Sequence, residues 1–366
     1  MKEKSFIQLP FYAKLTLVLV FLFFLFYIIY LGQSILLPLG FAFLFAVLLR
    51  PVEQALLNWH VPKIISIVIC LLLFVLVIFL LITFVSHQVT VLADDIPRIK
   101  KSLGDLWDKC QLWLNDKLNI SYKKQAEMVT DAKNETLNSM APATFNLLTG
   151  SFVTLTLLPV YIFLLLYYRT LFLQFLVEVF DSKHESRVRE VINEVRSVIQ
   201  HFVTGIMLET TLVAILNVVG LLLVGAPYAI LLGVTGAIIN TIPYIGGIVQ
   251  LVLSGLIVFS YESSVSAMFW AVGILIAVQF IDNYLLIPRI VASRVKLNGL
   301  ISIIGFLVAG AIAGIGGMFL SLPFLAIFKI VFDRVDELKP WGKLMGAEET
   351  PGVSRRPIRK KRIDKA

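Results

Sequence analysis

The sequence predicts an all-α fold, namely a polytopic helical membrane protein with several amphipathic surface helices. The first observation is composition, because 15% of the residues are charged, 58% are apolar and the mean hydropathy is +0.88. A soluble domain carries about 25% charged residues, because it needs polar side chains on its surface. The second observation is a series of long uncharged runs, and the third is that proline and glycine interrupt two of them.

The first 86 residues are expected to form three membrane helices. Their uncharged runs are Leu15–Leu31, Ile35–Leu49 and Ile64–Ser86. The last run has 23 residues, and an α-helix needs roughly 20 to cross the hydrocarbon layer. A short turn at Gly32 separates the first two helices, and Arg50 ends the second.

The next segment, residues 87–144, is polar and mixed in charge, and we expect it to lie outside the cytoplasm. Six of its residues follow a 3-4-3-4-3 spacing: Ile96, Ile99, Leu103, Leu106, Cys110 and Trp113. This spacing places them on one face of a helix. An amphipathic helix of this kind packs on a partner or lies on the bilayer surface.

A fourth span, Phe145–Tyr168 within residues 145–169, follows the insert. Residues 170–204 then repeat the apolar spacing, with Val188, Val191, Val195, Val198 and Phe202 on one face. Charged residues separate these side chains, so we predict a cytoplasmic amphipathic helix that enters the membrane near Thr204.

The segment 205–335 is predicted to be the C-terminal membrane core. Its apolar runs are Ile206–Val224, Tyr228–Ser260, Ser264–Leu286 and Leu300–Val335. The second is interrupted between Asn240 and Gly247, and the fourth is interrupted by glycines. A broken helix frees backbone groups, so the break must be buried in protein or line a wet cavity. We therefore expect two broken-helix hairpins, which either cross fully or re-enter partway.

The positive charge is concentrated at one end of the chain. The formal net charge is +8, and Arg355–Lys365 holds seven basic residues and one acid. We interpret residues 336–366 as a basic cytoplasmic tail rather than a nucleic-acid-binding run. The other basic loops agree with this orientation and place both termini in the cytoplasm.

Two acids in the spans are functional candidates, because ionisable groups are costly in a membrane. Glu209 lies about one turn inside the fifth span, where it could bind a cation, exchange a proton, or pair with a loop arginine near the interface. Asp282 and Asn283, with Gln279 one turn earlier, form a polar cluster at a helix end. Arg289 follows, so Asp282 could form a structural latch with it or part of a gate.

The neutral polar residues at membrane depth are Asn217, Asn240 and Gln250. Such residues most often bridge two helices, and the alternative is contact with a transported solute. Asn240 favours the second interpretation most, because it adjoins the interruption that contains Pro243, Gly246 and Gly247. Transporters use the free backbone groups of broken helices to bind polar solutes at mid-membrane.

The terminal hairpin is rich in small residues. Its packing candidates are Gly310, Gly314, Gly316, Gly317 and Pro323, of which the first two form a GxxxG pair. They are expected to permit close helix contact or to form a flexible hairpin tip.

Catalytic signatures are absent from the sequence. It contains no P-loop, no HExxH motif and no GxSxG motif, so the chain is not expected to be an enzyme. Its histidines, His60, His87, His184 and His201, lack the spacing of metal ligands. Neither a metal nor a cofactor is predicted.

Two stretches resemble a known family. Thr241-Ile242-Pro243-Tyr244-Ile245-Gly246-Gly247 looks like its IPYxG hairpin. Asp282–Arg334 is similar to its C-terminal signature, which has an acid, a proline, a basic loop, a glycine-rich run and Leu322-Pro323. On these residues the chain resembles the AI-2E family of transporters, also called the PerM-type permeases. One departure is that many members carry a His-Pro pair where this chain has Leu297-Asn298-Gly299.

The resemblance implies about eight membrane passes, homo-oligomers, and export of the signal autoinducer-2, while some members are assigned as sodium(lithium)/proton antiporters. Our leading hypothesis is a bacterial inner-membrane exporter of a small polar solute such as autoinducer-2. The alternative is a sodium(lithium)/proton antiporter in which Glu209 or Asp282 is the exchanging carboxylate. A third hypothesis is a membrane scaffold that transports nothing. Each places the chain in a lipid bilayer, and none involves nucleic acid.

Overall fold

The computed structural model describes residues 10–94, 104, 156–180, 185–242, 245–262, 264–291 and 297–346. Within these ranges the regular structure is helical, and an isolated bridge between Leu297 and Gly346 is the one β-type contact. The predicted all-α class is therefore confirmed. Five helices are long and apolar enough to cross a membrane, or six if a bent pair counts as one span. The total of about eight passes stays a prediction.

Three helices form the N-terminal part: α1 (Phe11–Leu31), α2 (Gln33–Asn58) and α3 (Lys63–Asp94). Nearly all apolar side chains of α1 are exposed, with Phe21 and Phe23 at 64% and 66%, as expected for a helix whose outer solvent is lipid. Helix α2 continues past Arg50, where the sequence predicted its end. The reason is that Arg50 Nη1 pairs with Glu53 Oε2 at 2.6 Å in a buried position, so the two charges compensate each other within the helix.

The fourth apolar segment bends instead of ending. The helix Thr156–Tyr167 meets α6 (Arg169–Val179) at an angle of 62°. The side chain of Lys63 fixes the bend through two contacts with Tyr167. Its Nζ donates to the Tyr167 carbonyl oxygen at 2.7 Å and lies 5.0 Å from the centre of the Tyr167 ring. Most of the predicted insert, with its amphipathic helix, lies outside the described residues, as does the beginning of this span.

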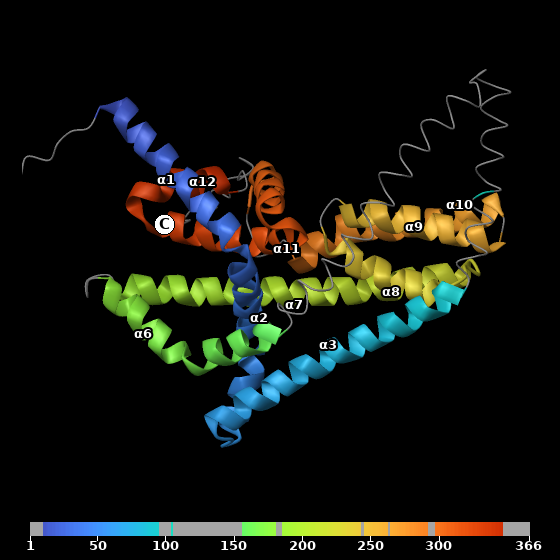
Figure 1. Ribbon diagram of the computed structural model, residues 1–366, viewed down its shortest axis with the longest axis horizontal. Helices are drawn as coiled ribbons and strands as arrows, with labels where there is room; N and C mark the ends of the chain where they lie inside the picture. Colours follow the sequence, from blue (N-terminus) through green and yellow to red (C-terminus); the bar gives the residue numbers. More distant parts are fainter. Residues whose placement is uncertain are drawn as a thin grey trace, which may run out of the picture.

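Helix α7 (Glu185–Leu223) is the element around which the others pack (Figure 1). Its 39 residues join the predicted amphipathic helix and the predicted fifth span into one continuous helix, about 58 Å long at 1.5 Å per residue. It contacts α2, α6, α8, α10, α11 and the π-helix that follows α10. The C-terminal half of α7, which carries Glu209, therefore packs within this group of helices.

The first broken run forms a helical hairpin beside α7. Helix α8 (Ala229–Asn240) turns at Thr241 and Ile242 into α9 (Ile245–Glu262). The arms are antiparallel and very close, because a Cβ at Gly236 would lie 2.5 Å from Gln250 Nε2 and one at Gly246 would collide with the Ile239 carbonyl oxygen. Only glycine allows this crossing.

Helix α10 (Val265–Ile281) packs antiparallel to α9. It begins at Ser264, whose hydroxyl accepts a hydrogen bond from the Ala267 N–H at 3.3 Å. It continues into a π-helix, η2 (Asp282–Val291). A π-helical turn is wider than an α-turn and is frequent at functional sites.

The last apolar run, α11 (Gly299–Arg334), folds back on itself at Ala313 and Gly314. Gly314 has φ 59° and ψ −150°, a backbone conformation that is essentially restricted to glycine. The two arms are antiparallel, because a Cβ at Gly305 would lie 2.5 Å from Leu325 Cδ1 and one at Gly310 would lie 2.5 Å from Met318 Cε. Pro323 is buried in the second arm.

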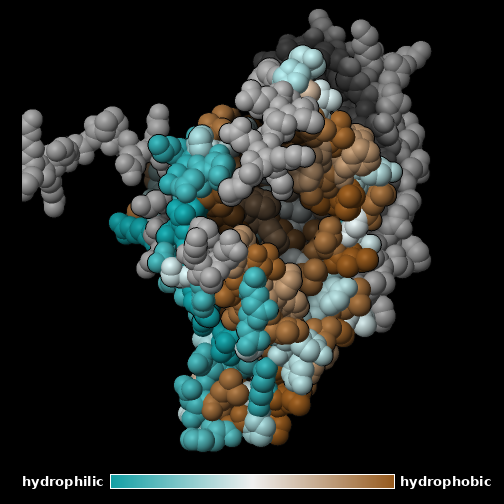
Figure 2. Space-filling view, turned by 90° about the vertical axis from the view of Figure 1, so that its left-hand side faces the viewer, coloured by the Kyte–Doolittle hydropathy of each residue, from teal (hydrophilic) through white to brown (hydrophobic). Residues whose placement is uncertain are grey.

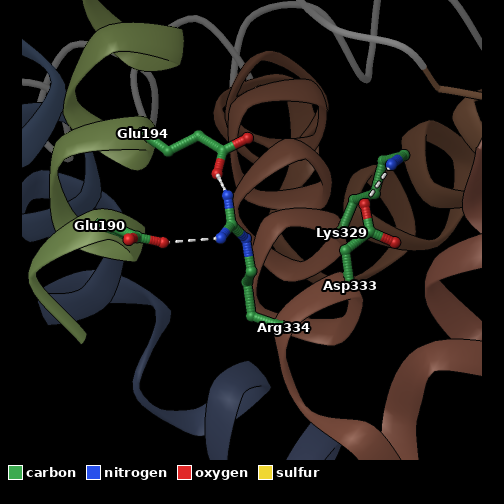
Figure 3. Close-up of polar contacts among 5 residues, drawn as sticks. All are labelled: Glu190, Glu194, Lys329, Asp333 and Arg334. Atoms are coloured by element: carbon green, nitrogen blue, oxygen red, sulfur yellow. Dashed lines mark hydrogen bonds and ion pairs between the residues drawn. The ribbon is translucent and has the colours of Figure 1, made fainter. Parts of the chain in front are cut away.

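The chain beyond α11 returns to it through η3 (Asp336–Leu338) and α12 (Lys339–Met345). Arg334 links α11 to the N-terminal part of α7, because its Nη1 and Nη2 donate to Glu190 and Glu194 at 2.9 Å each (Figure 3). Figure 2 shows this end of the molecule, where hydrophilic side chains gather on one side and hydrophobic side chains cover the other.

Candidate functional site

Two carboxylic acids meet where α7 packs against the π-helix. Glu209 lies on α7 and Asp282 is the first residue of the π-helix, and their residues are 7% and 0% exposed. The two carboxyl groups are close enough for each to affect the charge of the other. Because two negative charges in one buried place repel each other, the pair favours a state with a proton on one of the two groups. The pair is therefore arranged to hold a single proton between two acids.

The end of α8 supplies polar partners to the acid pair. Asn240 Nδ2 donates to Asp282 Oδ2 at 3.0 Å. On the other side, Thr210 Oγ1 donates to Glu209 Oε2 at 3.2 Å and also lies 3.4 Å from Thr241 Oγ1. The break between α8 and α9 therefore brings Asn240 and Thr241 to the two acids, which lie 73 positions apart in the sequence.

Helix packing explains why the acids face each other. One turn away along the same faces, Val213, Ala237 and Val278 form a buried apolar cluster. Since α7 and α10 are antiparallel, the register that pairs Val213 with Val278 also pairs Glu209 with Asp282. The apolar cluster closes one side of the acid pair and lowers the local dielectric constant there.

No basic side chain balances the pair within the described residues. Neither acid takes part in any of the ion pairs found there. Arg289, which the sequence suggested as a latch for Asp282, is exposed on the π-helix and forms none of those ion pairs. Asp282 Oδ1 is buried, and no nitrogen or hydroxyl donor of the described chain reaches it. A proton or a bound cation is what remains to neutralise these oxygens.

Gly247 and Gln279, two further residues that the sequence predicted, also lie at this site. A Cβ at Gly247 would lie 3.0 Å from Gln279 Oε1 and 3.4 Å from Asn240 Oδ1. Glycine at this position therefore allows α9 to approach both amide side chains. Gly246 permits the tight crossing, and Pro243 lies outside the described residues.

The remaining predicted residues lie apart from the acid pair. Asn217 on α7 and Gln250 on α9 are buried at 1% and 4% exposure, and their amide nitrogens have no partner in the described chain. Asn283 is exposed next to Asp282. Gly310, Gly314, Gly316 and Gly317 belong to the α11 hairpin. Sequence reasoning missed Thr241, and the one signal that could have found it was its place at the start of the helix break.

The donor set does not fit a transition metal or a divalent ion held by several acids. The described residues contain no group of three or more histidine, cysteine, aspartate or glutamate side chains that could hold a metal. What the site offers is two carboxyl groups, two hydroxyls and two amides. Oxygen ligands of this kind suit hard cations.

Comparison with known proteins shows that residues 18–337 match the family described as AI-2E family transporter. The protein named "Putative transport protein YueF" of Bacillus subtilis is 25% identical over 313 residues, which cover 82% of this chain and 84% of that protein. The AI-2 transport protein TqsA of Escherichia coli is 22% identical over 311 residues, or 83% of this chain and 87% of that protein. The Escherichia coli protein named "Putative permease PerM" is 26% identical over 181 residues, about half of each chain.

Proposed function

Because this chain belongs to the AI-2E family of transporters, we propose that it is a secondary transporter that exchanges protons for a monovalent cation at Glu209 and Asp282. The observation that carries the proposal is the contact of two buried acids with no ion-pair partner in the described chain. Exchange needs a group whose negative charge either a proton or a cation can neutralise, but not both at once. The acid pair meets this requirement, and it lies at a helix break of the kind that forms transport sites.

The exchange follows from the two states of the pair. With the proton bound to one of the two acids, the pair carries one negative charge, which Asn240 stabilises by its hydrogen bond to Asp282. When the proton leaves, two negative charges face each other in a region of low dielectric constant, and this state favours a cation. Cation binding in turn favours proton loss, so one substrate displaces the other.

Reconstituted vesicles test this function. The purified full-length chain is placed in liposomes with an internal pH dye, and a pulse of Na⁺ or Li⁺ is added outside. We expect cation-driven proton movement in the wild type and its loss in Glu209→Gln and Asp282→Asn. Glu262→Gln is the matched control, because Glu262 is exposed at the end of α9. Exchange that persists unchanged in both site variants would refute the proposal.

A second candidate is export of a small polar solute such as autoinducer-2. Two observations favour it, namely the similarity to the AI-2 transport protein TqsA and the unpartnered amide nitrogens of Asn217 and Gln250. Buried donors without an acceptor suit a ligand that carries hydroxyl or carbonyl oxygens. A deletion strain should then accumulate the solute inside the cell, and equal efflux with and without the protein would exclude this function. A membrane scaffold would be favoured if the reconstituted protein moved neither class of substrate.

The same proposal includes an arrangement in the cell. The chain is a bacterial inner-membrane protein whose termini and residues 170–204 face the cytoplasm, while residues 87–144 face outward. It assembles as a homo-oligomer. Labelling of single cysteines at residues 5 and 120 from either side of intact cells tests the orientation, and light scattering of the detergent-purified chain tests the assembly.

A further inference from the structure

A set of unsatisfied oxygens lies beside the acid pair. Asn240 directs its nitrogen to Asp282, so its oxygen points away, toward Gly247. Gln279 comes from a different helix and directs its oxygen to the same glycine. Neither of these amide oxygens accepts a hydrogen bond within the described chain, and Asp282 Oδ1 has no donor there. Two amide oxygens therefore face the same space without donors, and a third oxygen without a donor belongs to the aspartate that binds Asn240.

Glycine at position 247 is what allows this convergence. A Cβ there would be 3.0 Å from Gln279 Oε1, which is tighter than most real contacts, and 3.4 Å from Asn240 Oδ1. A side chain at position 247 would therefore fill the space that these two oxygens face. By contrast, a Cβ at Gly273 on α10 would have no heavy atom within 4 Å. A Cβ would therefore be crowded at Gly247 but not at Gly273, which makes Gly273 a matched control.

Oxygens that lack donors repel one another unless a positive group lies between them. A proton satisfies one pair of oxygens, but it cannot serve amide and carboxylate oxygens from three elements together. A cation can, because hard cations take several oxygen ligands, including amide carbonyls and carboxylates. The negative end of the α8 helix dipole at Asn240 adds to the attraction.

We propose that the side-chain oxygens of Asn240 and Gln279, together with the Asp282 carboxylate, bind a partly dehydrated monovalent cation, and that Gly247 keeps the space it needs. This inference rests on the proposed exchange function, and it adds the residues that select the cation. In this arrangement Glu209 and Asp282 hold the proton, while Asn240, Gln279 and Gly247 determine the size and affinity of the cation site.

Direct binding of ²²Na⁺ to the detergent-purified full-length chain at alkaline pH tests the site. We expect Gly247→Ala, which fills the space, and Gln279→Leu, which removes one ligand at similar volume, to weaken Na⁺ binding by about tenfold or more. Gly273→Ala is the matched control and should bind Na⁺ like the wild type. Gln279→Leu also guards against misfolding, because the Gln279 side chain makes no hydrogen bond within the described chain that its loss would break.

The outcomes separate this inference from the proposed function. Wild-type Na⁺ affinity in both Gly247→Ala and Gln279→Leu would overturn the cation site, even if the vesicles show exchange. Absence of ²²Na⁺ binding to the wild type would overturn it as well. Binding that the two variants weaken, in a protein whose vesicles move no protons, would support the site and contradict the exchange function alone.

Discussion

The two oxygens of Asp282 lie in different surroundings. Oδ2 accepts a hydrogen bond from Asn240 at 3.0 Å, while Oδ1 is buried and no nitrogen or hydroxyl donor of the described chain reaches it. A buried carboxylate that loses its only amide donor bears the full cost of desolvation. Asn240 is therefore a positioning residue, which holds Asp282 in the orientation that faces Glu209.

Replacing Asn240 by alanine should destabilise the protein by about 1–3 kcal/mol, because one buried oxygen is left without its donor. The midpoint of thermal unfolding in detergent measures this effect. Asn283→Ala is the matched control, since Asn283 is exposed beside the same aspartate. Equal midpoints for the two variants would contradict a supporting role for Asn240.

The sequence allowed part of this site to be predicted. Glu209, Asn240, Gln279 and Asp282 stand out because polar residues are rare in apolar runs. Their meeting could not be predicted, because the side on which α8 packs against α7 depends on contacts such as that of Gly233 with Val218. These contacts leave no periodic signal in the sequence.

At the scale of elements, helix breaks are easier to predict than helix bends. The interruption after Asn240 and the fold at Gly314 lie in stretches rich in glycine. Glycine adopts the non-helical backbone conformations of such breaks at little energetic cost. The 62° bend at Tyr168 has no glycine or proline and depends on Lys63, more than 100 residues away. The π-helix differs from this bend, because it contains Pro288, whose missing N–H disturbs the α-helical hydrogen bonds.

The fold of α11 gives a test at this scale. Gly314 has φ 59° and ψ −150°, so we expect Gly314→Ala to destabilise the terminal hairpin by about 1–3 kcal/mol of backbone strain. Gly316→Ala is the control on the same hairpin, because its Cβ would lie 3.5 Å from Leu37, an ordinary contact. Denaturant titration of the purified variants measures the difference. A Gly314 variant as stable as the Gly316 variant would show that the hairpin tip is not constrained.

At the scale of the whole molecule, one charged cluster joins distant parts of the chain. Arg334 binds Glu190 and Glu194, which lie 144 and 140 positions away, and Arg187 lies 3.7 Å from Asp336. Through these contacts the terminal hairpin is held to α7, the helix that carries Glu209. We call this set of residues the α7–α11 clamp.

The clamp should depend on salt. Its ion pairs are partly exposed, so each contributes about 0.2–1 kcal/mol at low ionic strength, and the Debye length falls to about 3 Å at 1 M salt. We expect Arg334→Ala to lower the unfolding free energy by about 1 kcal/mol at low salt and to have little effect at high salt. Arg189→Ala is the control, because Arg189 pairs with Glu185 on the same helix. A loss for Arg334→Ala that salt does not change would contradict the electrostatic origin.

Acid should release the clamp through Asp336. Its hydrogen bond with Lys339, and then the charges of Lys339 and Arg187, hold the pKa of this carboxyl group below its ordinary value. Because this pKa is lowered, the stabilisation is complete above the pKa of aspartate in the unfolded chain, which is about 3.9. It is lost as the pH falls through the lower pKa of Asp336 in the folded chain.

We expect amide hydrogen exchange in η3 and α12 to rise below about pH 4 in the wild type. In Asp336→Asn this part of the acid response should be absent. Glu337→Gln, which replaces an exposed neighbour outside the ion pairs of the described chain, should respond as the wild type does, and a loss of the response in that variant instead would assign the acid sensitivity to another group.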